Sequence, residues 1–178
     1  MKTIRLLTFA TLMAGTLTLS SGAFASTAAH VSVKNCVPAQ LRVGVSRSQG
    51  AAGTIYYPLV ITNVGATACA VWGVPGIQPV TRSVTKTFAR VGPPARNTSM
   101  GEMPVRHVTQ PHHSVSVAFG VTEAGNYPRA VCAPRRATGI EVSLGAFLRP
   151  TYIALRISVC TKFASTTTRL IVAGTSGN

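Results

Sequence analysis

The chain contains no aspartate, and three of its 178 residues are acidic: Glu102, Glu123 and Glu141. This shortage argues against whole classes of enzyme. A glycoside hydrolase needs two carboxylates across a cleft, whereas here Glu141 faces outward in an alternating segment and the other two fall in loops or turns. A serine hydrolase needs a nucleophile, a base and usually an orienting carboxylate, and no Gly-x-Ser-x-Gly or phosphate-cradling Gly-x-x-x-x-Gly-Lys pattern is present. We therefore expect a protein that is not an enzyme.

Aromatic residues are also scarce, at 6% of the chain, while the formal net charge is +14. Single-strand nucleic-acid binders need aromatic side chains for base stacking, so we expect no specific nucleic-acid partner. The basic residues are scattered singly, with Arg135-Arg136 the one adjacent pair. A positive surface attracts polyanions, which predicts anionic cell-envelope components as partners; the alternative is that the charge serves solubility alone. The oligomeric state is left open.

Long apolar stretches are absent except at the N-terminus. Lys2 and Arg5 precede an apolar stretch that runs to Leu19, and Ala23-Phe24-Ala25 follows as a small-x-small site. This pattern predicts a signal peptide over residues 1–25, cleaved after Ala25. The stretch is too short and too rich in Thr, Ser and Gly to cross a membrane. We expect residues 26–178 to form a single secreted, extracytoplasmic domain at the cell envelope, with no transmembrane segment.

The chain has four cysteines, Cys36, Cys69, Cys132 and Cys160, all beyond the signal. An even count in an exported protein predicts two disulfides. The spacings of 33, 63 and 28 residues contain no CxxC metal or redox motif. Four cysteines allow three pairings; we expect the local one, Cys36 with Cys69 and Cys132 with Cys160.

Apolar residues alternate with polar ones along much of the chain, which is typical of half-buried strands. The clearest segments are 41–47, 114–122, 140–144 and 153–159, and weaker ones are 54–63, 69–72, 77–82, 85–91, 105–109 and 169–173. Turn residues separate them. About eight to ten short strands predict an all-β fold, a β-sandwich stapled by two disulfides. We expect residues 93–101 to form a mobile loop and residues 165–168 a turn.

Several motifs follow one another in a recognisable order. They are Cys36, a Leu-x-Val strand at Leu41, Gly50–Gly53, Tyr56-Tyr57, Thr62–Gly65, Cys69, Trp72–Gly76, Pro111, the strand at 115–121, Cys132 and Cys160. This order resembles the actinobacterial secreted domain-of-unknown-function family 4232. The resemblance implies an immunoglobulin-like β-sandwich with two internal disulfides outside the cytoplasm, and it implies no activity. Two departures stand out: Val74 follows Gly73 where an aromatic residue is usual, and His112 follows Pro111 where glycine is expected.

Simple turn chemistry accounts for Asn63-Val64-Gly65 and Pro75-Gly76, because Asn and Gly tolerate a positive φ and Pro presets φ near −65°. Trp72, the one tryptophan, comes three residues after Cys69. We expect it to pack in the core near a disulfide.

One cluster of residues has metal-binding chemistry. Met100, Met103, His107, His112 and His113 fall within 14 residues. Thioethers suit Cu(I) and imidazoles suit Cu(II), so this segment predicts a copper site anchored by His112 or His113. The competing interpretation is an exposed turn with gap-filling methionines, and adjacent strand residues face opposite sides. Three functions thus remain: an envelope binding module, a copper-binding protein, or a purely structural surface protein. Apart from copper, we expect no cofactor.

Overall fold

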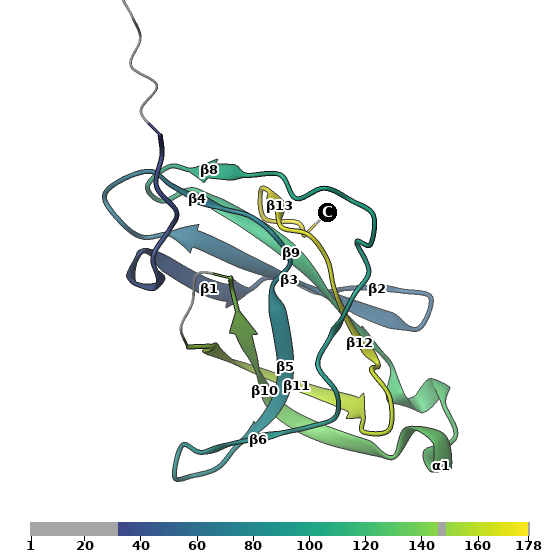
Figure 1. Ribbon diagram of the computed structural model, residues 1–178. Helices are drawn as coiled ribbons and strands as arrows, with labels where there is room; N and C mark the ends of the chain where they lie inside the picture. The colour runs from purple at the N-terminus through teal and green to yellow at the C-terminus, as the bar shows by residue number, and fades with distance from the viewer. Residues whose placement is uncertain (1–31, 146–148, 178) are drawn as a thin grey trace, which may run out of the picture. The chain divides into compact units, whose positions relative to one another are not determined.

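Residues 32–145 and 149–177 are described by the computed structural model, and strands dominate them (Figure 1). The predicted signal peptide and its cleavage site at Ala25 lie outside these residues. In chain order the strands are β1 (Leu41–Val45), β2 (Gln49–Ala51), β3 (Thr54–Asn63), β4 (Cys69–Val71), β5 (Gly76–Arg82), β6 (Phe88–Arg90), β7 (Arg96–Asn97), β8 (His107–Thr109), β9 (Ser114–Thr122), β10 (Pro134–Ser143), β11 (Thr151–Cys160), β12 (Thr166–Thr168) and β13 (Val172–Ala173). The helical turns are η1 (Pro38–Gln40), η2 (Ala124–Asn126) and α1 (Arg129–Cys132). Within the described residues, no helix has the length and apolar character needed to span a membrane.

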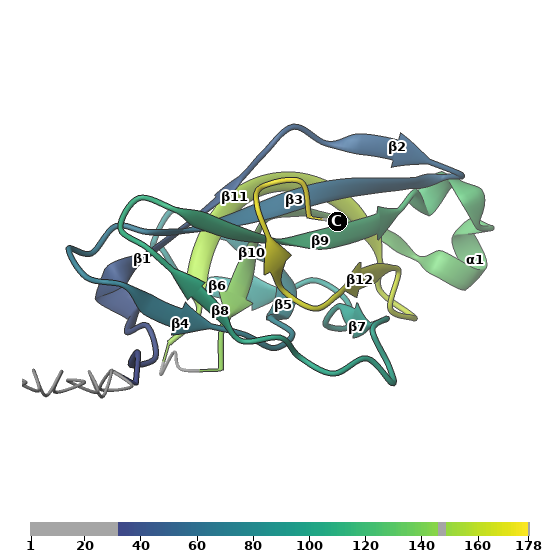
Figure 2. The ribbon, with the colours of Figure 1, turned by 90° about the horizontal axis from the view of Figure 1, so that it is seen from above.

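The larger sheet is organised around β3 and β9. Its order is β1-β3-β9-β12-β7, with β2 added to β3 and β13 added to β9. Tyr57 lies opposite Phe119 and Leu59 opposite Val117, so these side chains share the inward face and join the core. Figure 2 shows the C-terminal strands β12 and β13 following β9, with which both pair. The predicted strand at 114–122 is confirmed, with Val115, Val117, Phe119 and Val121 inward.

The smaller of the two main sheets has the order β11-β10-β5-β6 and is antiparallel throughout, and β4 and β8 pair as a separate two-stranded sheet. Its inward side chains include Ile77, Ile140, Val142, Ile153 and Ile157, each 9% exposed or less. They form one core cluster with the inward residues of the larger sheet. Burying each such side chain stabilises the fold by about 1.5–3 kcal/mol. The predicted all-β sandwich is confirmed; the described residues contain more strands than expected because several edge strands are two or three residues long.

Both disulfides are buried in this framework. Cys36–Cys69 joins the segment before β1 to the start of β4, and Cys132–Cys160 joins the end of α1 to the end of β11. This is the local pairing of the three that four cysteines allow. No free cysteine is found in the described residues. Disulfides persist in oxidising compartments, so the two bonds indicate an environment outside the cytoplasm.

The turn predicted at residues 165–168 is wrong, because this segment contains strand β12. Thr166 and Thr168 face inward and are 1% and 2% exposed. The Thr168 hydroxyl donates to the Pro75 carbonyl at 3.2 Å, which satisfies a polar group in the interior. Threonine is β-branched and fits a pleated strand. A run of polar residues shows no apolar alternation, however, so the pattern did not reveal the strand.

Two further ranges differ from expectation. The predicted loop at 93–101 contains β7, which pairs in parallel with β12. Within the predicted strand at 169–173, pairing is confined to β13. Strand β7 forms because β12 gives it a pairing partner, whereas β13 pairs with β9 directly.

Trp72 is 43% exposed, so the prediction that it packs in the core is wrong. The buried run Cys69–Val71 ends immediately before it, and the indole emerges at the surface. The guanidinium carbon of Arg106 lies 5.6 Å from the indole centroid. Arg106 also donates hydrogen bonds to the Val33 carbonyl and to Asn35 Oδ1, which hold it in place. The cation therefore covers part of the ring that the core does not.

Candidate binding surfaces

The outward side of the smaller sheet carries one arginine from each of its four strands. The pairing partners Arg90, Val80, Gly139 and Ala154 form one row across the sheet. Residues two apart on a strand share a face, so Arg82 and Arg156 lie on the same side as this row. Arg136 is opposite Ser158, two residues beyond Arg156. We call this surface the arginine face: Arg82 on β5, Arg90 on β6, Arg136 on β10 and Arg156 on β11, all exposed.

An aromatic pair anchors part of the arginine face. The rings of Phe88 and Tyr152 lie 5.1 Å apart, and the guanidinium carbon of Arg82 is 5.8 Å and 5.1 Å from their centroids. The Tyr152 hydroxyl donates to the Thr138 carbonyl at 3.2 Å. A Cβ atom at Gly139 would lie 2.4 Å from Tyr152 Cε2, so the glycine makes room for the ring. The two rings consequently hold the Arg82 cation in a defined position.

The charge of the arginine face is not balanced by neighbouring carboxylates. The ion pair present among the described residues joins Arg169 to Glu102 at 4.0 Å, and neither residue lies on this face. Glu141 is on the same side of β10, half-buried, opposite Tyr152 and Gln78. Four cations against one carboxylate make a positive surface. Because neighbouring strands lie about 4.8 Å apart, the cations spread over about 15 Å.

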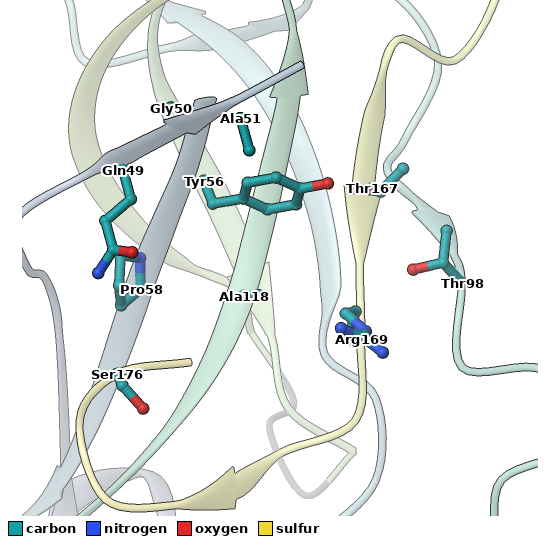
Figure 3. A pocket seen from close by; sticks show the side chains of 10 residues that line it. All are labelled: Gln49, Gly50, Ala51, Tyr56, Pro58, Thr98, Ala118, Thr167, Arg169 and Ser176. Carbon is teal, nitrogen blue, oxygen red and sulfur yellow. The ribbon is translucent and has the colours of Figure 1, made fainter. Parts of the chain in front are cut away.

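A groove of about 480 Å³ lies on the outward side of the larger sheet (Figure 3). Its floor is the small side chain of Ala118 on β9. Pro58 of β3 and the β2 strand lie on one side of it, Thr167, Arg169 and Thr98 lie on the other, and the Tyr56 ring lies across β9 between them. Ser176 of the C-terminal segment lies at one end, and the adjacent Gly177 N–H donates to Ser116 Oγ at 2.9 Å. The groove is therefore built from four separate parts of the chain.

The groove has one formal charge, the guanidinium of Arg169, among neutral polar groups. The Tyr56 ring lies across β9, and its Cε1 would be 3.1 Å from a Cβ atom at Gly120. Tyr56 as a whole is 37% exposed. The glycine thus lets the ring lie flat on the sheet while part of it stays open to the groove.

Asn63 connects three segments beside the β8–β9 turn. Its Nδ2 donates to the carbonyls of Thr67 and Thr109 at 2.8 Å and 2.9 Å, and its Oδ1 accepts from the Gly65 N–H at 2.9 Å. Its backbone carbonyl accepts from the His112 N–H at 2.7 Å, and its N–H donates to the His113 carbonyl at 3.0 Å. Asn63 is fully buried. The Thr-Asn-x-Gly motif is thus structural.

His112 has a backbone φ of 64°, in the left-handed region. Pro111 precedes it, and the His113 N–H donates to the Gln110 carbonyl at 3.0 Å, which closes a turn. A turn of this kind, with Pro first and a positive φ second, favours glycine at the second position. The glycine expected here from the resemblance therefore has a conformational reason.

The predicted copper ligands occupy three places. Met100 and Met103 are 83% and 85% exposed between β7 and β8. His107 in β8 is half-buried, with Nε2 2.9 Å from the Ile171 carbonyl oxygen. His112 and His113 are exposed in the turn before β9. Across the described residues no three His, Cys, Asp or Glu side chains form a metal-holding group. That observation does not test a site that includes thioethers, so copper binding stays a prediction.

Comparison with known proteins places the chain in a family. Residues 36–172 match the family described as Domain of unknown function (DUF4232). The chain belongs to this family. The match begins at Cys36 and ends at Val172, so it covers both disulfides and strands β1 to β12 of the DUF4232 domain. The comparison with curated proteins finds none that matches.

The two surfaces of this DUF4232 domain were not foreseen from its sequence. Three arginines of the arginine face stand singly and Arg136 follows Arg135, but the alternation of residues along each strand does not show which of them become neighbours across the sheet. Lateral neighbours depend on the strand order β11-β10-β5-β6, which brings together segments more than 50 residues apart. The groove needed the pairing of β12 with β9, and β12 was predicted to be a turn.

Proposed function

We propose that this protein is an exported, non-catalytic binding module that attaches through its arginine face to linear anionic polymers of the cell envelope. The observation that carries the proposal is the set of four exposed arginines, one per strand, that make no ion pair with a described carboxylate. A positive field attracts polyanions and raises their association rate.

The arrangement of the cations supports an extended partner over a small one. Small-ligand sites are concave, with polar groups that converge. The four arginines instead lie on the outward face of four neighbouring strands, which together span about 15 Å. A polymer with repeated phosphate or carboxylate groups can contact several of them at once, whereas a single small anion cannot.

Two features support a role without a catalytic step. The three carboxylates lie on separate elements: Glu102 between β7 and β8, Glu123 before η2, and Glu141 on β10. All four thiols are oxidised, which leaves no cysteine nucleophile in the described residues. The two disulfides and the signal-like N-terminus support export.

The test is binding of the purified mature chain to immobilised long-chain polyphosphate and polyglutamate. A face variant carries Arg82→Gln, Arg90→Gln, Arg136→Gln and Arg156→Gln. A matched control carries Lys34→Gln, Arg42→Gln, Arg47→Gln and Arg129→Gln, which removes the same charge from exposed positions elsewhere. Each exposed charge contact contributes on the order of 0.5–1 kcal/mol, so we expect the face variant to bind at least about tenfold more weakly.

Salt provides the second readout. Raising salt from about 0.1 M to 1 M shortens the Debye length from about 10 Å to about 3 Å, so attachment by the native chain must weaken. Equal losses in the face variant and the control would mean that net charge alone is responsible, and would refute the proposal. Binding to anionic vesicles but to neither polymer would also refute it, in favour of a lipid surface.

A further inference from the structure

We propose that the groove on the larger sheet binds a single acidic sugar, a ring that carries a phosphate or carboxylate group, with Arg169 as the anion contact and Tyr56 as the ring contact. This site is separate from the arginine face, because the groove lies on the outward side of the other sheet and shares no residue with it. The inference therefore stands whether or not the face binds polymers.

Arg169 is available to an anionic ligand although it is paired. Its Nη2 lies 4.0 Å from Glu102 Oε1, and the two side chains are 48% and 55% exposed. An exposed pair at this separation contributes little to stability. A phosphate or carboxylate in the groove can accept a shorter, bidentate pair of hydrogen bonds from the guanidinium. Glu102 does not line the groove, so it acts as an internal competitor for the cation.

Tyr56 provides the contact expected for a sugar ring. Its ring rests over Gly120 on one side, and 37% of the residue is exposed. The face of an aromatic ring carries negative partial charge, so it attracts the C–H groups of a sugar face. Pro58 also lines the groove and adds apolar surface to it.

The remaining groups match the hydroxyls of a sugar. Gln49 supplies an amide, and Thr98 and Thr167 supply hydroxyls from the opposite wall (Figure 3). The amide and the Thr167 hydroxyl can donate and accept, whereas the Thr98 hydroxyl donates to the Thr168 carbonyl at 3.4 Å and offers its oxygen as an acceptor. The volume of about 480 Å³ falls within the range of small-ligand sites. Because the groove has one cation among neutral hydrogen-bonding groups, it favours a ligand that has one negative group on a polyhydroxylated ring.

The test titrates the mature chain with four ligands: glucuronate, glucose 6-phosphate, glucose and inorganic phosphate. Calorimetry and NMR measure the binding of each ligand. We expect the two acidic sugars to bind more tightly than glucose or inorganic phosphate. Arg169→Gln should weaken acidic-sugar binding by about tenfold, because a charge-assisted contact is lost. Glu102→Gln should tighten it about two- to fivefold, because the competing carboxylate is gone. Glucose binding should respond to neither change.

Three controls separate the contributions. Arg42→Gln removes an arginine from β1, outside the groove, and should change affinity less than about twofold. Tyr56→Phe keeps the ring and should retain most of the binding, whereas Tyr56→Ala should lose it. The four-arginine face variant should bind acidic sugars like the native chain. The inference is overturned if Arg169→Gln and Glu102→Gln shift affinity in the same direction, if inorganic phosphate binds as tightly as the acidic sugars, or if neither acidic sugar binds.

Discussion

Replacing Asn63 with alanine tests whether a single buried amide holds one end of the larger sheet together. The substitution removes two hydrogen bonds from Nδ2 and one to Oδ1, and it leaves the carbonyls of Thr67 and Thr109 and the Gly65 N–H without their partner. Each lost bond costs about 1 kcal/mol, and buried unsatisfied groups add to this, so we expect a loss of about 3–5 kcal/mol. Against a typical stability of about 5–15 kcal/mol, that is a large fraction.

Urea unfolding with both disulfides intact measures this loss as a lower midpoint at similar slope. The matched control is Asn126→Ala, since Asn126 is exposed and its Nδ2 makes one hydrogen bond, to the Gly53 carbonyl at 3.0 Å. The control should lose less than about 1 kcal/mol. If Asn63→Ala costs no more than Asn126→Ala, the reasoning about the buried amide is refuted.

Asn63→Asp adds a pH readout to the same position. The change keeps the side-chain oxygen that accepts from the Gly65 N–H. It replaces the amide NH2 group, which donates to two carbonyl oxygens, with a second carboxyl oxygen. Burial raises the pKa of the introduced carboxyl above its unfolded value of about 3.9. A carboxyl with a raised folded pKa stabilises the fold most when protonated, so the loss should be smallest below about pH 3.9 and should grow as pH rises through the folded pKa. A loss that does not vary with pH would contradict this account.

Three further predictions concern the turn, a disulfide and the tryptophan. His112→Gly should stabilise the fold by about 0.5–1 kcal/mol, because glycine adopts a positive φ without strain. His113→Gly should destabilise the fold, and unfolding midpoints that move in the same direction for both variants would contradict the assignment of the positive φ to position 112. Replacing both Cys132 and Cys160 with alanine should lower the free energy of unfolding by about 3.5 kcal/mol in the chain-entropy model, for a sequence separation of 28 residues. Denaturant unfolding of the variant and the native chain measures this difference, and a loss below about 1 kcal/mol would show that the bond adds little stability. Trp72 should be quenched by acrylamide in the folded protein, since it is 43% exposed; resistance to quenching would place it in the core.

Much of the core could be predicted from the sequence because alternation reports a local property. The spacing in segment 114–122 predicts that Val115, Val117, Phe119 and Val121 face inward, and all four are buried in the core. The same logic failed for β12, where threonines occupy the interior positions. The prediction for Trp72 rested on its position three residues after Cys69, and it failed because strand β4 ends at Val71 and the indole is exposed.

The candidate surfaces depend on which strands become neighbours. Tyr56 and Arg169 are more than 100 residues apart in the chain, and the pairing of β3 with β9 and of β9 with β12 brings them to one groove. Arg82 and Arg156 share a face for the same reason. A residue pattern records the solvent side of each strand but contains no information about strand order.

The amino-acid sequence by itself determined the fold class, the positive charge and the inward faces of the main strands, because these follow from composition and from a period of two residues. Tertiary structure alone decided the arginine face and the groove, because each requires long-range pairing that sets separate segments side by side.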